Sequence, residues 1–599
     1  MRRQSAEISR RNFCPATNKF EIAVGLVGFT LTLIVAAGCA TLGVADIKSP
    51  VRPDLGPNVL LFDPAMPQVA MQQQIDKIYT LERRNEFGPE RYALLFLPGA
   101  YQLDVPVGFY TQVIGLGASP DAVHISGNIH ADASHDNNNN ATTTFWRAAE
   151  GFSVTPTGGT MQWAVSQAVP FRRMHVRGNL VLHQHRGWAS GGWMSDTLVD
   201  GNVDSGTQQQ WISRNSEWAS WTGSNWNMVF VGVPHPPQGD WPNPPYTKVD
   251  ETPVVREKPF LEVDAKGQWS VRVPSLRRKS VGTTWHGGLT AGRSIPLDQV
   301  YIARSGTDTA ASINAQLAQG MHLLFTPGIY DLTEPIRVTR PETVVLGLGF
   351  ATLRPIHGTA AMATADADGI EIAGLLFDAG PETSPVLLEV GTEGSKARHD
   401  QNPITLHDVF FRVGGAGVGR AQTNLRINSN DVIVDHTWIW RADHSEGVGW
   451  TSNTSANGLV VNGDDVTVYG LFVEHHQQFQ VLWKGNGGRT YFYQSEIPYD
   501  PPDQLSYCSA PGTNGWASYK VADSVASHEA WGLGIYSVFI QPSVVLSRAI
   551  EVPRKPGIRF HHMITVALGN HGEISDVIDD RGGPTAIHPR LTPKVAQFP

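Results

Sequence analysis

The segment ALLFLPGAYQLDVPVGFYTQVIGLG, residues 93–117, recurs in altered form as HLLFTPGIYDLTEPIRVTRPETVVLGLG, residues 322–349. In both copies a Leu-Leu-Phe run leads to Pro-Gly, and an alternating apolar run then leads to Gly-Leu-Gly. Phe96 and Phe325 hold the matching position, 229 residues apart. A duplication of this size indicates that the chain contains two modules of one fold.

Short strand-forming runs, interrupted by Gly, Pro, Asn or Asp, make up both copies, and apolar residues at helical spacing are rare. Similar runs recur at roughly 20 to 35 residues, the length of one coil of a parallel β-helix. Examples are residues 369–380, 430–444, 463–476 and 487–499. A β-sandwich would instead need hairpin turns every 8 to 12 residues or so.

We therefore predict an all-β protein of two tandem right-handed parallel β-helices, similar in fold to pectate lyases and packed side by side. The N-terminal β-helix is expected over residues 50–233 and the C-terminal β-helix over residues 297–599. Residues 234–296 are the predicted connection and surface linker, because the segment 233–255 is too rich in proline for a central strand.

The first 45 residues predict targeting rather than fold. Residues 9–13, SRRNF, resemble a twin-arginine export signal, and an uncharged run over residues 22–45 follows. We expect a periplasmic, cell-envelope or extracellular location. A retained membrane anchor is the alternative, since the run is long enough to span a bilayer. Residues 35–39 resemble a lipoprotein cleavage box, which would place a lipid on Cys39.

Composition restricts the partners. The net charge of −9 is spread along the chain without a basic stripe, which argues against nucleic acid. Seventeen Trp together with abundant Asn, Gln and Gly favour a surface that faces sugars. Cys508 is the one cysteine after the targeting segment, so that part has no intrachain disulfide. We expect a monomer that binds a polysaccharide or oligosaccharide and needs neither cofactor nor metal.

Two glutamates, Glu474 and Glu496, are 22 residues apart, about one coil. If Leu471 and Val473 point into the core, Glu474 points outward, and the same alternation turns Glu496 outward. The two would lie on adjacent rungs, with backbones about 4.8 Å apart. Like charges this close raise one pKa, as a general acid requires. A solvated ladder of surface acids is the alternative.

Gln167 and Ser190 form a second pair, 23 residues apart and beside aromatic residues. Together they could hold a water molecule if the two modules face each other across a cleft. Taken singly, each is more typical of a turn or a buried polar residue.

Three segments of the second module are WIWRADH (438–444), VEHHQQFQV (473–481) and QSEIPYDPP (494–502). They resemble, in the same order, the ADH, SEH and QTETPYYQP segments of glycoside hydrolase family 55. WAVSQA, SGGWMSD and TQQQWISRN, within residues 163–215, are similar to family segments of the first module. The resemblance covers nearly all of the chain after the first 45 residues. It implies tandem β-helices that cleave β-1,3-glucan, mostly from the chain end and with inversion.

Carried over residue by residue, the resemblance implies that Glu496 is the general acid and Glu474 the second acidic residue. Gln167 and Ser190 would position the attacking water. Sugar contacts are expected from a further set of residues: Asp443, His444, Gln494, Tyr499 and Trp193. For Asp443 and His444, a buried pair that holds a turn is the alternative.

The chain departs from the family pattern beside the predicted acid. Tyr499-Asp500-Pro501-Pro502 replaces two tyrosines, a glutamine and a proline, while Ile497 and Val473 replace hydroxyl residues. These changes affect the sugar-lining shell more than the acid. Hydrolysis is therefore a firmer expectation than β-1,3-glucan as the substrate.

Two other functions stay open. A polysaccharide lyase would need an acidic Ca²⁺ cluster and a basic residue, and Asp464-Asp465 is the best local cluster. A non-catalytic carbohydrate-binding β-helix would need only the aromatic residues. Inverting enzymes separate their carboxyl groups by about 6.5–9.5 Å and retaining enzymes by about 5–5.5 Å. Adjacent rungs suggest the smaller value, so inversion is implied by the resemblance alone.

Overall fold

The computed structural model describes residues 52–133, 139–569 and 571–599. The predicted export signal, membrane anchor and lipid attachment at Cys39 lie outside these residues. Within the described residues, no helix is long and apolar enough to cross a membrane.

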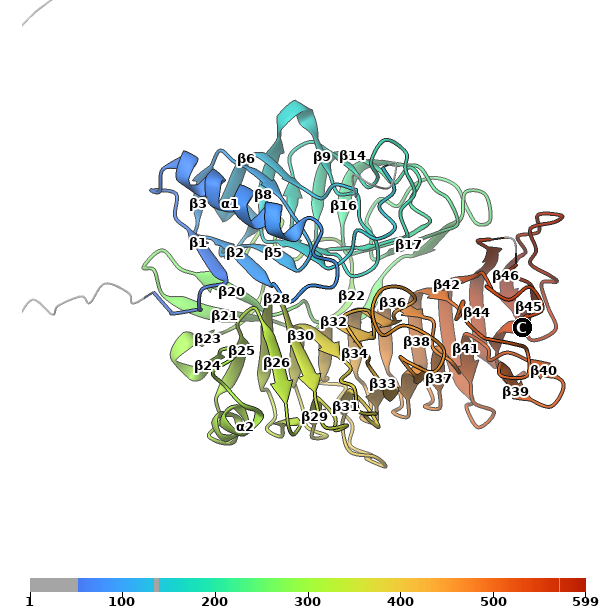
Figure 1. Ribbon diagram of the computed structural model, residues 1–599. Helices are drawn as coiled ribbons and strands as arrows, with labels where there is room; N and C mark the ends of the chain where they lie inside the picture. Colours follow the sequence, from blue (N-terminus) through green and yellow to red (C-terminus); the bar gives the residue numbers. More distant parts are fainter. Residues whose placement is uncertain (1–51, 134–138, 570) are drawn as a thin grey trace, which may run out of the picture. The chain divides into compact units, whose positions relative to one another are not determined.

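Strands dominate, and the main sheets are almost entirely parallel (Figure 1). The predicted all-β class with tandem β-helices is confirmed. The described residues form two α-helices, α1 (Gln68–Glu82) and α2 (Ala310–Ala318), each of which follows the first strand of its module. This shared position reflects the duplication seen in the sequence. Short 3₁₀ turns are η1 (Pro120–Ala122), η2 (Thr157–Gly159) and η3 (Leu297–Gln299).

The N-terminal β-helix contains two parallel sheets. One sheet has, in spatial order, β1 (Val59–Phe62), β2 (Tyr92–Phe96), β5 (Thr111–Gly115), β7 (Arg147–Glu150), β10 (Pro170–Arg172), β13 (Trp193–Ser195), β15 (Gln210–Arg214), β17 (Asn227–Val231) and β18 (Tyr246–Val249). The other has β3 (Gly99–Tyr101), β4 (Asp104–Pro106), β6 (Val123–His130), β8 (Ser153–Pro156), β9 (Thr160–Gln162), β11 (His175–Val176), β12 (Asn179–Val181), β14 (Leu198–Asp204) and β16 (Glu217–Thr222).

The C-terminal β-helix repeats this plan. One sheet has β24 (Val300–Ala303), β25 (His322–Phe325), β26 (Ile329–Leu332), β28 (Val344–Pro355), β30 (Glu371–Asp378), β32 (Thr405–Val413), β34 (Ile433–Arg441), β36 (Thr467–Glu474), β38 (Gly488–Glu496), β42 (Ser527–Ser537), β44 (Gly557–Ala567) and the antiparallel β46 (Lys594–Phe598). The other has β27 (Ile336–Val338), β29 (Met362–Thr364), β31 (Leu388–Val390), β33 (Ala421–Ile427), β35 (Ser455–Val461), β37 (Val481–Trp483), β41 (Tyr519–Val521), β43 (Leu546–Glu551) and β45 (Ile574–Ile578). A small hairpin has β39 (Cys508–Ala510) and β40 (Thr513–Asn514).

The connection differs from the prediction at its start. β18 pairs in parallel with β17, so the first β-helix continues past residue 233 to Val249. Prolines precede β18 instead of interrupting it, and β18 is the edge strand, where half of the hydrogen-bonding groups need no partner. Small antiparallel sheets follow, made of β19 (Thr252–Val255), β20 (Phe260–Val263), β21 (Trp269–Pro274), β22 (Arg277–Ser280) and β23 (Gly292–Pro296). Glu257 and Lys258 are buried, so this segment is not a surface linker throughout.

A left-handed residue sets which side chains of β36 face outward. Val468 faces the core, Gly470 has a φ of 63°, and Leu471 and Val473 then face the core. Simple alternation from Val468 would turn Glu474 inward, but the extra residue reverses the alternation. The strand registers skip this position in successive rungs. The left-handed residues thus form a column of Asp408, His436, Gly470 and Phe492.

Aromatic rings join the two β-helices in one buried cluster. The ring centroids of Trp146 and Trp438 are 4.8 Å apart. Rings at this distance contribute packing energy beyond the area that they bury. The cluster includes Phe109, Tyr110, Phe145, Trp146, Trp193 and Ile212 from the first β-helix, and Phe350, Phe410, Trp438, Trp440, Phe472 and Phe492 from the second.

Buried ion pairs cross the same interface. Arg172 of the first β-helix bonds Asp408 and Asp435 of the second, both at 2.8 Å. Arg214 bonds Asp435 at 2.9 Å and Glu257 of the connecting segment at 2.7 Å. Burial alone would raise the pKa of Asp435, but the charges of Arg214 and Arg172 outweigh it and hold that pKa well below its usual value. Arg172 therefore has its acidic partners only while the β-helices are docked.

We expect Asp435→Asn to destabilise the fold by about 3–5 kcal/mol, because it leaves buried guanidinium groups without a full counter-charge. The free energy of unfolding from denaturant titration measures this loss. Asp331→Asn is the matched control: Asp331 pairs with Arg354 at a position where both side chains are more than a third exposed, and such pairs contribute about 0–1 kcal/mol. Equal losses in the two variants would contradict the assigned role of the buried pairs.

Candidate active site

The register of β36 and β38 places Glu474 directly opposite Glu496, on adjacent rungs, as the spacing predicts. Both are the last residues of their strands, and both face outward because of the left-handed column. They face the N-terminal β-helix rather than solvent: Glu474 is 2 % exposed, and Gln167 of that β-helix contacts it. A solvated ladder of surface acids is therefore excluded.

A cavity of about 230 Å³ lies between the β-helices at these carboxyl groups. Its lining includes Thr142, Thr143, Phe145, Gln167 and Ser190 from the first β-helix, and Trp438, Trp440, Asp443, His444, Glu474, His475, Glu496 and Tyr499 from the second. A cavity of about 430 Å³ adjoins it and shares Thr142, Ser190, Glu496 and Tyr499. Trp188 and Trp226 line this second cavity, with ring centroids 6.1 Å apart and nearly parallel planes.

Glu474 accepts hydrogen bonds from both β-helices. Gln167 Nε2 and Gln494 Nε2 donate to its Oε1 at 3.1 and 2.7 Å, and Trp438 Nε1 donates to its Oε2 at 2.8 Å. Burial raises the pKa of Glu474, and the positive charge that His475 carries when protonated opposes this, together with the Gln494 and Trp438 donors. Three N–H donors at its two oxygens favour the ionised form, so Glu474 gives up its proton at lower pH than Glu496 does.

Glu496 is the member of the pair that keeps its proton to the higher pH. Burial raises its pKa well above the usual value, and the charges of Glu474 and Asp443 raise it further. The Tyr499 hydroxyl hydrogen-bonds its Oε2. A carboxyl group that keeps its proton at neutral pH can donate that proton to a bound molecule.

Gln167 is held by its backbone in a strained conformation. Its φ is 46°, its N–H donates to Gly191 at 3.1 Å, and His436 Nε2 contacts its carbonyl oxygen at 3.2 Å. Because its Nε2 donates to Glu474, its Oε1 points away from that carboxylate and has no partner among the described residues. Ser190 lies in the next coil and lines both cavities. The structure brings this pair and the glutamates together.

Asp443 and His444 also line the smaller cavity. His444 Nδ1 is 2.9 Å from Asp443 Oδ1, and its Nε2 is 2.8 Å from Glu86 Oε1 of the first β-helix. Burial would lower the pKa of His444, but hydrogen bonds to Asp443 and Glu86 raise it to about 10. Glu86 has no signal in the sequence, since it belongs to a loop that reaches the site only through docking of the β-helices.

Two predicted sugar contacts differ in the structure. Gln494 is fully buried and bonds Glu474, so it supports the carboxylate instead of lining a cavity. Trp193 is also fully buried: its ring stacks on His436 with a centroid distance of 5.1 Å, and a Cβ at Gly470 would meet that ring at 2.5 Å. Trp193 is therefore part of the interface core. Tyr499 lines both cavities, and its contact with sugar stays a prediction.

Trp438 and His475 are further lining residues that the sequence reasoning did not assign. Both lie within segments that carry the family resemblance; His475 directly follows Glu474, and Trp438 begins the segment that contains Asp443. Their position in those segments was the available signal.

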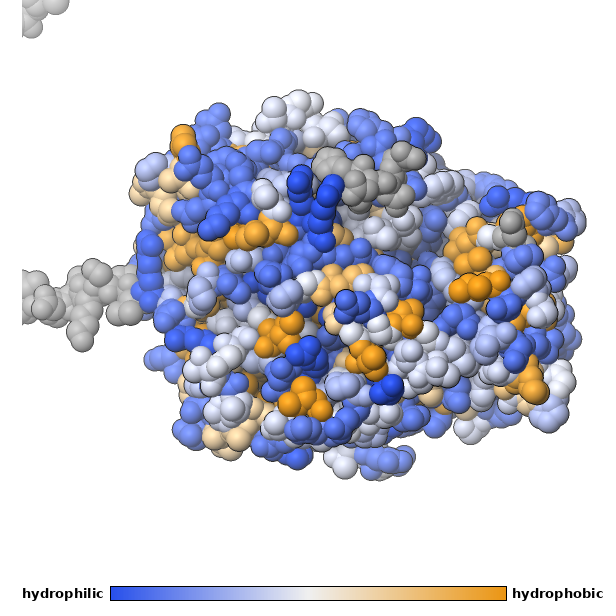
Figure 2. Space-filling view, viewed as in Figure 1, coloured by the Kyte–Doolittle hydropathy of each residue, from blue (hydrophilic) through white to orange (hydrophobic). Residues whose placement is uncertain are grey.

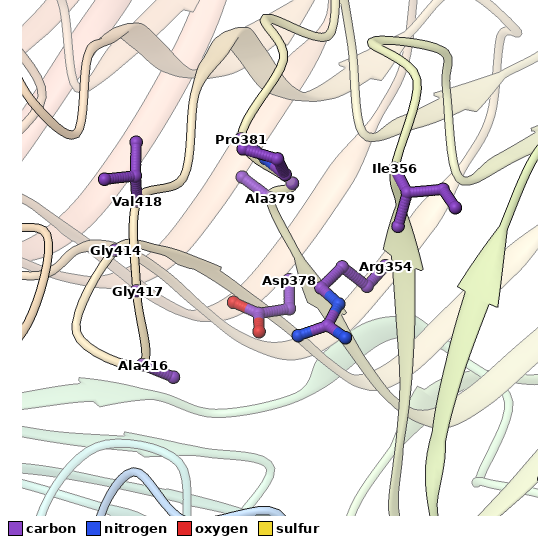
Figure 3. A pocket seen from close by; sticks show the side chains of 10 residues that line it. Arg354, Ile356, Asp378, Ala379, Pro381, Gly414, Ala416, Gly417 and Val418 are labelled. Carbon is purple, nitrogen blue, oxygen red and sulfur yellow. The ribbon is translucent and has the colours of Figure 1, made fainter.

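A separate cavity of about 310 Å³ in the C-terminal β-helix shares no lining residue with the carboxyl site (Figure 3). Its charged side chains, Arg354 and Asp378, are paired with Asp331 and Arg412. No group in its lining is left to act as an acid, so it is not the candidate site.

A proton-bearing carboxyl group beside an ionised one, in a cleft lined by aromatic rings, has the chemistry needed to cleave a glycosidic bond. These features define the class of glycoside hydrolases. The family model of the LAM55 pectate lyase-like domain matches residues 300–496. An exo-beta-1,3-glucanase of Streptomyces sp. (strain SirexAA-E / ActE) is 45% identical over 590 residues, 96% of each chain. The chain belongs to glycoside hydrolase family 55 and is a glycosidase.

Solved structures agree with this membership. The structure of sacteLam55A from Streptomyces sp. SirexAA-E matches with a TM-score of 0.89 and 47% identity, covering 91% of this chain and 99% of that one. A glutamate-to-alanine variant of that protein in complex with glucose also matches with a TM-score of 0.89, covering 92% of this chain. The predicted family and fold are thus confirmed.

We expect Glu474→Gln to lower the pKa of Glu496, because the variant removes the nearest negative charge that favours its protonated form. Infrared spectroscopy can follow the protonated carboxyl band across pH, and Glu496→Gln identifies that band by its loss. In Glu474→Gln the band should disappear at lower pH than in the unmodified protein. An unchanged titration would show that the two carboxyl groups are not coupled.

Proposed function

We propose that this glycosidase is exported and cleaves β-1,3-glucan from the chain end with inversion, using Glu496 as the general acid. The relative that matches over 96% of its chain is named an exo-beta-1,3-glucanase, which supports the substrate and the exo mode. The SRRNF segment and the uncharged run after it support export. The observation that carries the catalytic proposal is the position of protonated Glu496 between two adjoining cavities.

A general acid must reach the oxygen that joins two sugars, so one sugar must lie on each side of it. Glu496 meets this requirement, since it lines both cavities. We assign the terminal glucose to the smaller cavity and the remaining chain to the larger one. Trp188 and Trp226 would carry the chain there by stacking against sugar rings.

Closure of the smaller cavity supports cleavage at the chain end. Phe145, Trp440 and His444 line it, and His444 bonds Glu86 from the opposite β-helix. This contact joins the two walls of the cleft beside the site for the terminal sugar. A longer chain would have to break it in order to pass through.

The water that attacks the sugar would bind between Gln167 and Ser190. Gln167 Nε2 donates a hydrogen bond to ionised Glu474, which leaves the Oε1 of Gln167 free to accept a hydrogen bond from water. Gln167 and Ser190 belong to the first β-helix, whereas Glu496 belongs to the second. A sugar between them would be attacked on the face opposite its leaving oxygen. This opposition favours inversion more than the rung spacing of the glutamates does.

The lyase alternative has weaker support. Asp465 pairs with Arg398 at 2.7 Å, and Asp464 Oδ1 accepts from the Asn486 backbone at 2.7 Å, so a turn accounts for both. Within the described ranges, no group of three or more His, Cys, Asp or Glu could hold a metal ion.

We expect Glu496→Gln to lower kcat on a natural glucan by about 10²–10⁴-fold, because the amide cannot donate the proton. An aryl β-glucoside with an activated leaving group needs little protonation, so its hydrolysis should fall far less. Ser190→Ala and Gln167→Ala are the matched comparison: they should slow both substrates, since every substrate needs the water. Near-normal turnover of natural glucan by Glu496→Gln would sink the acid assignment.

Substrate and stereochemistry are tested together with a glycan panel. We expect β-1,3-glucan to release glucose whose initial anomer, followed by proton NMR, is α. A β anomer would indicate retention. Products that absorb at 235 nm would indicate a lyase, because elimination leaves an unsaturated sugar. Cleavage of another linkage only would reject β-1,3-glucan as the substrate.

A further inference from the structure

Asp500 is a charged departure from the family pattern that the proposed mechanism does not use. It lines neither cavity at the carboxyl groups. Its side chain turns to Arg441, where Nη1 donates to Oδ1 at 2.9 Å and Nη2 donates to Oδ2 at 2.8 Å. Arg441 is 1 % exposed and Asp500 23 %. This two-point geometry fixes both position and angle, which a single hydrogen bond would not.

Arg441 is a hub for the loops around the site. Beyond Asp500, its guanidinium donates to the carbonyl oxygens of Asn453 at 2.7 Å, Gly449 at 3.1 Å and His475 at 3.2 Å. His475 directly follows Glu474, and its backbone N–H donates to the Glu496 carbonyl oxygen at 2.8 Å. One buried cation therefore ties the ends of both glutamate strands to the loop that carries Asp500.

Tyr499 links this loop to the acid. It directly precedes Asp500, its hydroxyl bonds Glu496 Oε2, and its ring meets the His475 ring at a centroid distance of 4.4 Å. Pro498 and Pro501 flank the two residues and restrict the backbone further. Holding Asp500 therefore holds the tyrosine that sets where the Glu496 carboxyl group points.

We propose that the Arg441–Asp500 pair is a positioning device that aims the proton of Glu496 at the leaving oxygen. Asp500 does not touch the substrate and acts through Tyr499. The proposal rests on Glu496 being the general acid. It assigns a mechanistic role to one of the residues at which this chain differs from the family segment.

The test is Asp500→Asn, which keeps the shape of the side chain and removes its charge. We expect kcat on a β-1,3-glucan oligosaccharide to fall about tenfold, a part of the full effect of a general acid, with KM changed less than about twofold. On an activated aryl β-glucoside, kcat should change less than about twofold. This leaving group needs little protonation, so the orientation of the acid has little effect on its rate. Asp503→Asn, a substitution of the same type in the same loop at an exposed residue, should match the unmodified enzyme on both substrates.

The pH profile gives a second readout. Activity that needs protonated Glu496 is lost as pH rises through the pKa of that group. Because a Tyr499 donor favours the ionised carboxylate, weakening that bond should raise the pKa and move the basic limb of kcat to higher pH. Titratable or charged groups that face Glu496 are Glu474, Asp443, His475, Tyr499, Tyr536 and Arg590. None of these is altered in Asp500→Asn.

The outcomes separate the two proposals. An equal loss on both substrates, or an unshifted basic limb, would show that Asp500 has only a structural role and would overturn the inference. If Glu496→Gln also lacks a leaving-group dependence, the proposed acid itself fails. Should Asp500→Asn not fold, as judged by circular dichroism, Asp500→Glu keeps the charge and displaces the loop by one methylene. Asp500→Glu should lower kcat on the oligosaccharide more than on the aryl glucoside. An equal fold-loss on the two substrates, relative to the unmodified enzyme, would again overturn the inference.

Discussion

The docking of the two β-helices rests on charges that neither can bury alone. Arg172 and Arg214 from one converge on Asp435 of the other, and Glu257 from the connecting segment closes the group. Removing charges from water costs several kcal/mol per ion unless partners compensate them in good geometry. A displaced β-helix would strand these charges in an apolar interface. The network therefore defines one docking position of the two β-helices. Packing of aromatic rings alone would define that position less precisely.

Fixed docking is what turns two surfaces into one site. The residues that would hold water come from the first β-helix, and the proton donor comes from the second. Gln167 bridges the two by bonding Glu474, and His444 bridges them again by bonding Glu86. The ionic network thus fixes the separation of the two cleft walls. These cross-cleft hydrogen bonds can form only if that separation is kept. Outside the cleft, the face shown in Figure 2 is mostly hydrophilic, with apolar residues in small separate groups.

Local repetition in the sequence was enough to predict the fold and part of the site. Coil-length spacing placed Glu474 opposite Glu496, and the register bears this out. What the sequence could not show depends on contacts between modules. Trp193 looked like a sugar contact, but Gly470 on the other β-helix gives its ring a place in the core. Glu86 reaches His444 from a loop 358 residues away, and no local pattern predicts such a pair. The chemical roles of the site residues were also implied by the family resemblance, because spacing alone does not distinguish a catalytic acid from a surface carboxylate.

The column of left-handed residues has a consequence for how such a protein can change. In each rung, one left-handed residue decides which of the following side chains in the strand face the core and which face outward. An extended backbone at Gly470, in place of the left-handed one, would exchange inside and outside for the residues that follow and turn Glu474 into the aliphatic core, although no side chain of the site had been replaced. Insertions and other changes in the loops between rungs, such as the loop that carries Tyr499, leave the inward or outward orientation of the strand side chains unchanged.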